Sequence, residues 1–229
     1  AHAGGAPHLG INALNAAMMA MTAINFNRET FRDEDSIRVH PIITKGGEAV
    51  SAVPADVRME TFVRGRSLEA LMDANAKVDR ALRAGAMAVG ADVKIQTIPG
   101  YMPLQQHKGM AEIFRANAVD LVGEDNVGYV NHRGGSTDMG DLSHIMPACH
   151  PYTAGAVGSG HSSEYLITDY ESAVINPAKI MAMLVIDLLA DGAKQAKEVK
   201  SNHRPLLTKN AYVKFQREQA EISEFDGAA

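Results

Sequence analysis

The order of secondary-structure elements predicted for residues 9–98 is the feature that most constrains the fold. In two segments, 9–25 and 68–89, apolar residues recur at steps of three and four, which places one apolar stripe on each of two helices. Residues 57–64 instead alternate between apolar and polar, which is typical of a strand with one covered face. Two further strands are predicted over 37–43 and 93–98. The predicted order is therefore helix, strand, strand, helix, strand.

This order is a split β-α-β unit whose first strand is absent. The fold class that it predicts is α/β, with a ferredoxin-like antiparallel sheet covered by two helices over residues 1–100. The missing strand would have to precede Ala1, and the chain opens without Met on a helix that lacks its sheet partner. We therefore expect a fragment, a processed chain or an incompletely covered one.

A second part is predicted over residues 101–229, because Pro99-Gly100 and Pro103 punctuate the chain where its composition changes. The helix that begins at Asn176-Pro177 and runs to about Ala190 is apolar nearly all round, so we expect other structure to cover it. The remaining elements predicted for this part are a helix over 103–122, strands over 127–130 and 144–150, and an exposed helix over 210–222.

Composition excludes several classes of function. The 229 residues are 46% apolar and 21% charged, which is ordinary for a soluble globular protein. The net charge of -5 is spread without blocks, so the chain offers no footprint for nucleic acid or a membrane surface. No uninterrupted apolar run approaches about 18 residues and no leader pattern opens the chain, so we expect a cytoplasmic protein. The expected partner is a small molecule or a second copy of the chain.

Three ordered motifs give this chain a resemblance to a known family. They are Ala1-His2-Ala3-Gly4-Gly5-Ala6-Pro7-His8, Ser136-Thr137-Asp138-Met139-Gly140-Asp141 and Gly155-Ala156-Val157-Gly158-Ser159-Gly160-His161. Together they resemble the aminoacylase and glutamate-carboxypeptidase family of two-metal amidohydrolases, and most closely its aminobenzoyl-glutamate hydrolase branch. The resemblance implies that residues 1–100 form a lid domain that also makes a homodimer contact. Residues 101–229 would then be the C-terminal part of an α/β catalytic domain.

His161 is the candidate metal ligand. An imidazole on a glycine-rich turn can approach a metal closely, and neutral imidazole is a common zinc ligand. The resemblance makes His161 a ligand in a site that holds two divalent ions, zinc or manganese, in the complete enzyme. The alternative is a loop histidine bonded to backbone carbonyls. The family's other ligands and its general base would come from the half before the lid.

Three further residues are candidates for catalysis or substrate binding. The resemblance makes His2 a lid histidine that reaches across the dimer and donates to the oxyanion or to a substrate carboxylate. Arg64 falls where the family has a lid arginine suited to gripping a carboxylate, and the alternative is a solvated charge at a strand end. Asp138 would orient a ligand or bind substrate, and the alternative is a helix cap or an Asx turn.

Two other positions limit these predictions. The turn 47–54 matches a family turn that usually has asparagine where Ser51 stands, which weakens any prediction of substrate contacts there. Cys149, the single cysteine, lies in an apolar segment and is interpreted as a structural thiol. His132 and His150 have no assigned role.

The leading interpretation is a metal-dependent amidohydrolase that cleaves the amide of an N-acyl amino acid or a dipeptide-like substrate. A second interpretation is a dimerisation or interaction module, or a non-catalytic remnant of such a hydrolase. A third is a nucleotide-binding α/β domain that uses Gly155–Gly160, but this loop lacks the Lys-Ser/Thr end of a phosphate-binding loop.

Overall fold

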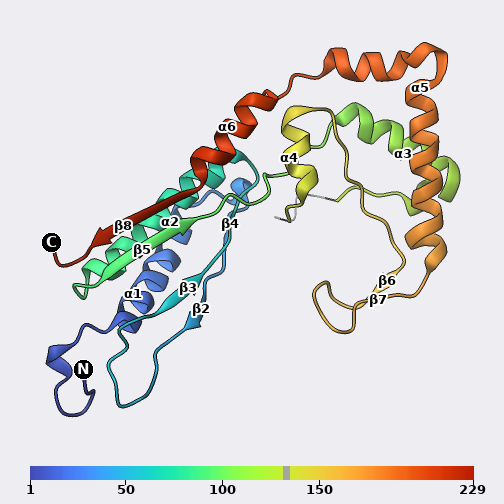
Figure 1. Ribbon diagram of the computed structural model, residues 1–229. Helices are drawn as coiled ribbons and strands as arrows, with labels where there is room; N and C mark the ends of the chain where they lie inside the picture. The colour runs from blue at the N-terminus through green and yellow to red at the C-terminus, as the bar shows by residue number, and fades with distance from the viewer. Residues whose placement is uncertain (131–134) are drawn as a thin grey trace. The chain divides into compact units, whose positions relative to one another are not determined.

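A computed structural model describes residues 1–130 and 135–229, which form two compact units (Figure 1). Unit 1 comprises Ala1–Pro103, 135–136 and Val213–Ala229, and unit 2 comprises 104–130 and 137–212. The two ends of the chain thus belong to the same unit, whereas the sequence predicted residues 213–229 in the second part. His132 lies outside the described residues.

Unit 1 mixes helices with short antiparallel strand pairs, and the predicted α/β class is confirmed. Strand β1 pairs with β4, and β2 pairs with β3. The predicted strand over 37–43 is divided at His40-Pro41, where proline cannot donate to a strand ladder. The elements of unit 1 that precede residue 100 are the 3-10 helices Pro7–Leu9, Asn27–Thr30 and Asp33–Asp35, helices α1 (Ala13–Phe26) and α2 (Leu68–Met87), and strands β1 (Arg38–Val39), β2 (Ile42–Lys45), β3 (Arg58–Glu60), β4 (Val63–Arg64) and β5 (Asp92–Thr97).

Helices α1 and α2 pack directly against each other and bury the main core of unit 1 (Figure 1). The side-chain oxygen of Asn12 accepts hydrogen bonds from the first turn of α1, and Ser67 does the same for α2. The buried cluster consists of Ile24, Val39, Val78 and Ala81. At Gly85 the backbones come so close that a β-carbon would lie 2.4 Å from the carbonyl oxygen of Ala16.

The last strand, β8 (Glu221–Asp226), pairs antiparallel with β5 along its whole length, from Asp92 opposite Asp226 to Thr97 opposite Glu221. The helix predicted through residue 222 is therefore wrong at its end, because α6 (Lys209–Gln219) stops three residues earlier. Residues 221–226 become a strand because β5 offers a backbone ladder, and this partner lies far away in the sequence.

The described residues of unit 2 are mostly helical and form one small hairpin. The strand predicted over 127–130 is wrong, since these residues form no regular element. The strand predicted over 144–150 is also wrong, because the apolar run includes the end of a helix in which His144 is buried and its Nδ1 lies 2.9 Å from the Gly140 carbonyl oxygen. The elements are α3 (Lys108–Val122), a 3-10 helix (Glu124–Asn126), α4 (Asp138–Ile145), β6 (Ala156–Val157), β7 (Leu166–Ile167), a π-helix (Glu171–Ile175) and α5 (Asn176–Asn202).

Helix α5 begins at Asn176, as predicted, but Asn176 does not cap it with its side chain. A π-helical turn over Glu171–Ile175 continues directly into α5, and this wider turn accommodates a proline that cannot make the usual backbone bond. The predicted end near Ala190 agrees with the structure, since the backbone leaves the helical region from Ala190 to Ala193.

The apolar surface of α5 is largely uncovered by the described residues, so the cover predicted for this helix does not come from them. Ile180 and Leu184 are buried, whereas four apolar side chains are more than half exposed: Met181, Val185, Ile186 and Leu189. By length and composition, the helical stretch Glu171–Asn202 could also cross a membrane, a test that core helices of soluble proteins pass too. Within this helix, Asp187 accepts a 2.7 Å hydrogen bond from the buried Asn117 of α3, so this turn of the helix packs on protein.

The close contact at Gly85 generates a stability prediction. Gly85→Ala should lower the free energy of unfolding by about 1–3 kcal/mol, because the added methyl group meets backbone atoms of α1 that cannot move away independently. Urea unfolding followed by circular dichroism measures this change. Gly100→Ala is the control, since a β-carbon there meets nothing within 4 Å. Equal stability of the two variants would contradict the direct backbone contact between α1 and α2.

Candidate functional site

The side chain of His2 is exposed but held in place by the main chain that follows it. Its Nδ1 atom accepts hydrogen bonds from the backbone N–H groups of Gly4, at 3.1 Å, and Gly5, at 2.9 Å. Because a backbone N–H can only donate, Nδ1 carries no proton in the neutral ring and Nε2 must carry it. His2 therefore presents an N–H donor at its exposed edge.

The backbone around His2 is tied to the turn 47–54. The N–H of Ala3 donates to the carbonyl of Ser51 at 2.8 Å, and the N–H of Val53 donates to the carbonyl of Ala1 at 2.9 Å. His2 and Ala52 thus lie opposite each other as an isolated antiparallel bridge. The contact uses the main-chain carbonyl of Ser51, which an asparagine would supply equally well.

Arg64 lies on β4, opposite Arg38 of β1, and its side chain is half-buried. Its guanidinium carbon lies 5.1 Å from the ring centroid of Phe62, within the range of a cation–π contact. No carboxylate forms an ion pair with Arg64 in the part of the chain that the structure describes. Its planar donors therefore stay available for an added carboxylate group.

His161 lies in the turn between β6 and β7, in unit 2. Its backbone adopts the left-handed conformation, with φ of 66°, which is uncommon for a residue with a β-carbon. The ring is exposed and makes no hydrogen bond to the described residues. The alternative that backbone carbonyls hold His161 thus gains no support from its surroundings.

Two of the glycines before His161 are needed for close backbone contacts at the β6–β7 hairpin. A β-carbon on Gly155 would lie 2.5 Å from the Asp169 carbonyl oxygen, and one on Gly158 would lie 2.3 Å from that of Glu164. Both glycines also have positive φ. Only Gly160, with nothing within 4 Å of its β-carbon position, leaves open space beside His161.

Asp138 and Asp169, two of the acidic residues near these motifs, have different environments. Asp138 is exposed at the first position of α4, where its charge interacts favourably with the helix dipole, and the preceding Thr137 is the cap residue. Asp169 accepts hydrogen bonds from the backbone of Glu171 and from both the backbone and the hydroxyl of Ser172. These bonds, the hydroxyl of Ser172 first, lower the pKa of Asp169 and mark it as a structural cap.

Unit 2 also contains a histidine pair that no sequence motif indicated. The rings of His107 and His203 lie 5.3 Å apart between centroids, in an edge-to-face arrangement. The Nδ1 atom of His107 accepts from the N–H of Met110 and so caps α3, while loss of solvation, together with His107, lowers the pKa of His203. A histidine directly before a helix can indicate such a cap, but nothing local indicates the distant His203.

The candidate residues are divided between the two units, and the described residues contain no group of three or more His, Cys, Asp or Glu side chains that could hold a metal ion. His2 and Arg64 belong to unit 1, and Asp138 and His161 belong to unit 2. A catalytic zinc needs about three protein ligands. Within these residues, His161 is thus a single candidate ligand and not a complete site.

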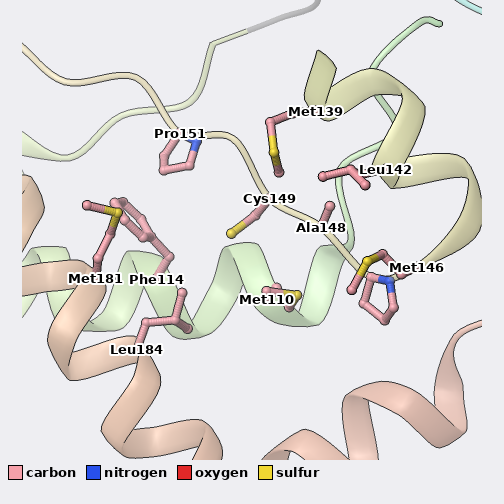
Figure 2. A pocket seen from close by; sticks show the side chains of 11 residues that line it. Met110, Phe114, Met139, Leu142, Met146, Ala148, Cys149, Pro151, Met181 and Leu184 are labelled. Carbon is pink, nitrogen blue, oxygen red and sulfur yellow. The ribbon is translucent and has the colours of Figure 1, made fainter. Parts of the chain in front are cut away.

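An apolar pocket of about 240 Å³ lies between α3, α4 and α5 in unit 2 (Figure 2). It contains no acid, base or hydroxyl side chain that could do chemistry. Cys149 faces it, and burial raises the pKa of the thiol, which supports the interpretation of a structural cysteine. The lining residues are Met110, Phe114, Met139, Leu142, Met146, Pro147, Ala148, Cys149, Pro151, Met181 and Leu184.

The shifted pKa of Cys149 predicts a slow, pH-dependent alkylation. In the folded protein the thiol should stay protonated to higher pH than an ordinary cysteine, so iodoacetamide labelling should rise only as pH passes the raised pKa. Folding favours the protonated form, so this group's contribution to stability is present below the unfolded pKa and is lost as pH rises through the folded one. Mass spectrometry of labelling with and without urea measures the difference, and equal rates would contradict the burial.

Comparisons with known proteins agree on one kind of relative. Residues 1–88 match the peptidase dimerisation domain. The Xaa-Arg dipeptidase of Mus musculus is 28% identical over 221 residues, which cover 90% of this chain and 50% of the relative. The Xaa-Arg dipeptidase of Homo sapiens is 27% identical over 198 residues, which cover 82% of this chain and 44% of the relative. The chain spans about half the length of the curated relatives that it matches.

Proposed function

We propose that the chain belongs to the aminoacylase and glutamate-carboxypeptidase family of metallopeptidases and is part of a hydrolase that cleaves the amide bond of a dipeptide-like or N-acyl amino acid substrate. The comparisons support the predicted family, but they give no specific support to the aminobenzoyl-glutamate branch. The observation that carries the proposal is the fixed N–H donor of His2, which lies within the matched dimerisation domain.

His2 is proposed to stabilise the charge that builds up on the amide oxygen. An N–H donor that is already oriented stabilises a developing oxyanion without reorganisation. As the resemblance implies, His2 would act in the active site of the partner subunit of a homodimer formed through residues 1–100. The exposure of the ring is compatible with this role.

Arg64 and Asp138 are each proposed to bind a charged group of a substrate. The name of the relatives describes dipeptides that end in arginine, which carry both a free carboxylate and a guanidinium. The unpaired guanidinium of Arg64 suits the carboxylate, and the exposed carboxylate of Asp138 suits a cationic side chain.

A divalent metal, zinc or manganese, is proposed as the cofactor, with two ions in the complete enzyme and His161 as one ligand. The exposed ring of His161 has no hydrogen bond to the described residues, so it fits this role. Its one imidazole cannot hold the ions, so the remaining ligands are proposed to come from elsewhere in a longer protein. A cytoplasmic location remains a proposal that rests on composition alone.

A second candidate is a non-catalytic dimerisation module or a remnant of the hydrolase. It is favoured by the absence of a three-ligand group within the described residues. The intact mass of the native protein separates the two candidates. A native chain of this length without hydrolytic activity would favour the module.

The proposed role of Arg64 predicts a selective loss of binding. In the complete enzyme, Arg64→Gln should raise KM about tenfold or more for a dipeptide with a free C-terminal carboxylate, because the charged bidentate contact is lost. KM for the same dipeptide with an amidated C-terminus should change little. Arg58→Gln is the control, since Arg58 already pairs with Asp56. Equal effects on both substrates would contradict the anchoring role.

The proposed roles of His2 and His161 predict losses of activity that differ in metal content. In the complete enzyme, His2→Ala should lower kcat and leave the metal content unchanged, because the residue would stabilise charge without holding an ion. His161→Ala should remove metal and activity together. Kinetic assays combined with elemental analysis of the purified variants measure both effects.

Mixing these two inactive variants is the sharper test. A heterodimer with one defect per subunit rebuilds one active site that has an intact His161 and the partner's intact His2. If subunits exchange freely, about half the dimers are mixed and roughly a quarter of wild-type activity returns. No recovery despite exchange verified by native mass spectrometry would show that His2 does not act across the dimer.

A further inference from the structure

We infer that the main-chain N–H groups of Gly4 and Gly5 are positioning groups for catalysis, because they hold His2 in the tautomer that carries its proton on Nε2. The inference rests on the proposed function, in which His2 donates a hydrogen bond to the reacting amide. The positioning groups are the two backbone N–H groups, so any residue other than proline could supply them.

The two N–H groups converge on one atom. Their nitrogens lie 3.1 and 2.9 Å from Nδ1 of His2, and neither can accept a hydrogen bond. A ring that carried its proton on Nδ1 would oppose both donors and would lose both hydrogen bonds. The neutral tautomer with Nε2–H is therefore the one that this turn stabilises.

The backbone of the turn is fixed on both sides. The His2 carbonyl accepts from the N–H of Ala6 at 3.0 Å, which closes the turn over Gly4 and Gly5. The preceding and following residues, Ala1 and Ala3, bond to the strand-like segment 51–53. With the main chain held, the contact at Nδ1 fixes the ring rotation as well as the proton position.

The tautomer matters because the alternative, with the proton on Nδ1, could not donate a hydrogen bond from Nε2. With the proton on Nδ1, the exposed Nε2 would present a lone pair, which repels the negative charge that develops on an amide oxygen. A free imidazole exchanges between the two tautomers. The Gly4 and Gly5 amides would therefore keep His2 in its donor form before substrate arrives.

The space around the turn provides a matched control. A β-carbon on Gly4 or on Gly5 would lie 3.5 Å from the His2 ring, which is ordinary van der Waals contact. Neither glycine has a positive φ. Alanine at either position should thus keep the N–H and the turn, whereas proline or an ester linkage at position 5 removes the N–H.

The test is the tautomer of His2, read by long-range ¹H–¹⁵N NMR of the full chain labelled with ¹⁵N-histidine, at a pH where histidine is neutral. The His2 signals are assigned by their loss in His2→Gln. Wild type and Gly5→Ala should show a pyridine-type Nδ1 and a protonated Nε2. Gly5→Pro should shift the Nδ1 signal towards the tautomer average of the urea-unfolded chain. An ester at position 5, introduced with the α-hydroxy analogue of alanine, should do the same without the ring of proline.

Two outcomes would overturn the inference. One is a wild-type His2 that carries its proton on Nδ1, and the other is an ester variant whose tautomer matches that of Gly5→Ala. In the complete enzyme, the ester variant should lower kcat roughly tenfold at unchanged KM relative to Gly5→Ala, because the donor is no longer oriented. An unchanged kcat would also overturn the positioning role. If no variant and no wild type hydrolyses any dipeptide, the proposed function fails, and the NMR result still reports on the tautomer.

Discussion

The contact between α1 and α2 at Gly85 is the constraint on which the rest of unit 1 depends. Because the backbones meet there, the two helices can bury Ile24 and Val78 in one core. The start of α1 is tied in turn to the turn 47–54, since the N–H of Ala13 donates to the Pro54 carbonyl at 2.9 Å. The same turn binds residues 1–3. The helix packing is therefore transmitted, through backbone hydrogen bonds, to the position of His2.

Elements that depend on local sequence patterns were predicted well, whereas strand pairings between residues far apart in the sequence were not. The stripes of α1 and α2 follow from helical spacing, which each segment carries in itself. Strand β8 gains its structure from β5, and nothing in residues 221–226 reveals that partner. The run 144–150 packs inside unit 2, where His144 is buried and Cys149 lines the apolar pocket. An apolar run alone does not distinguish a strand from the end of a helix.

In the candidate site, the sequence indicated the side chains but not the backbone contacts that orient them. Motifs indicated His2, Arg64, Asp138 and His161, and their proposed roles await the experiments above. The hydrogen bonds that orient His2 come from main-chain amides, which every residue but proline possesses. No sequence pattern could therefore have predicted its tautomer. Conversely, the glycines of the 155–160 loop were predicted to clear space for a metal, while Gly155 and Gly158 are required by the closure of the β6–β7 hairpin.

Unit 2 lacks two things within the described residues, which are further metal ligands for His161 and a cover for the apolar surface of α5. His161 offers one ligand where a catalytic metal needs about three. On α5, Val185, Ile186 and Leu189 expose apolar surface that the described residues do not cover, while Asp187 of the same helix is satisfied by Asn117. Large apolar surfaces left in water favour association with another protein surface. A polypeptide segment that covered α5 and also carried acidic or histidine side chains towards His161 would meet both needs at once. If His161 binds metal as proposed, a surface that packs against unit 2 would need an apolar contact with α5 and metal ligands near His161.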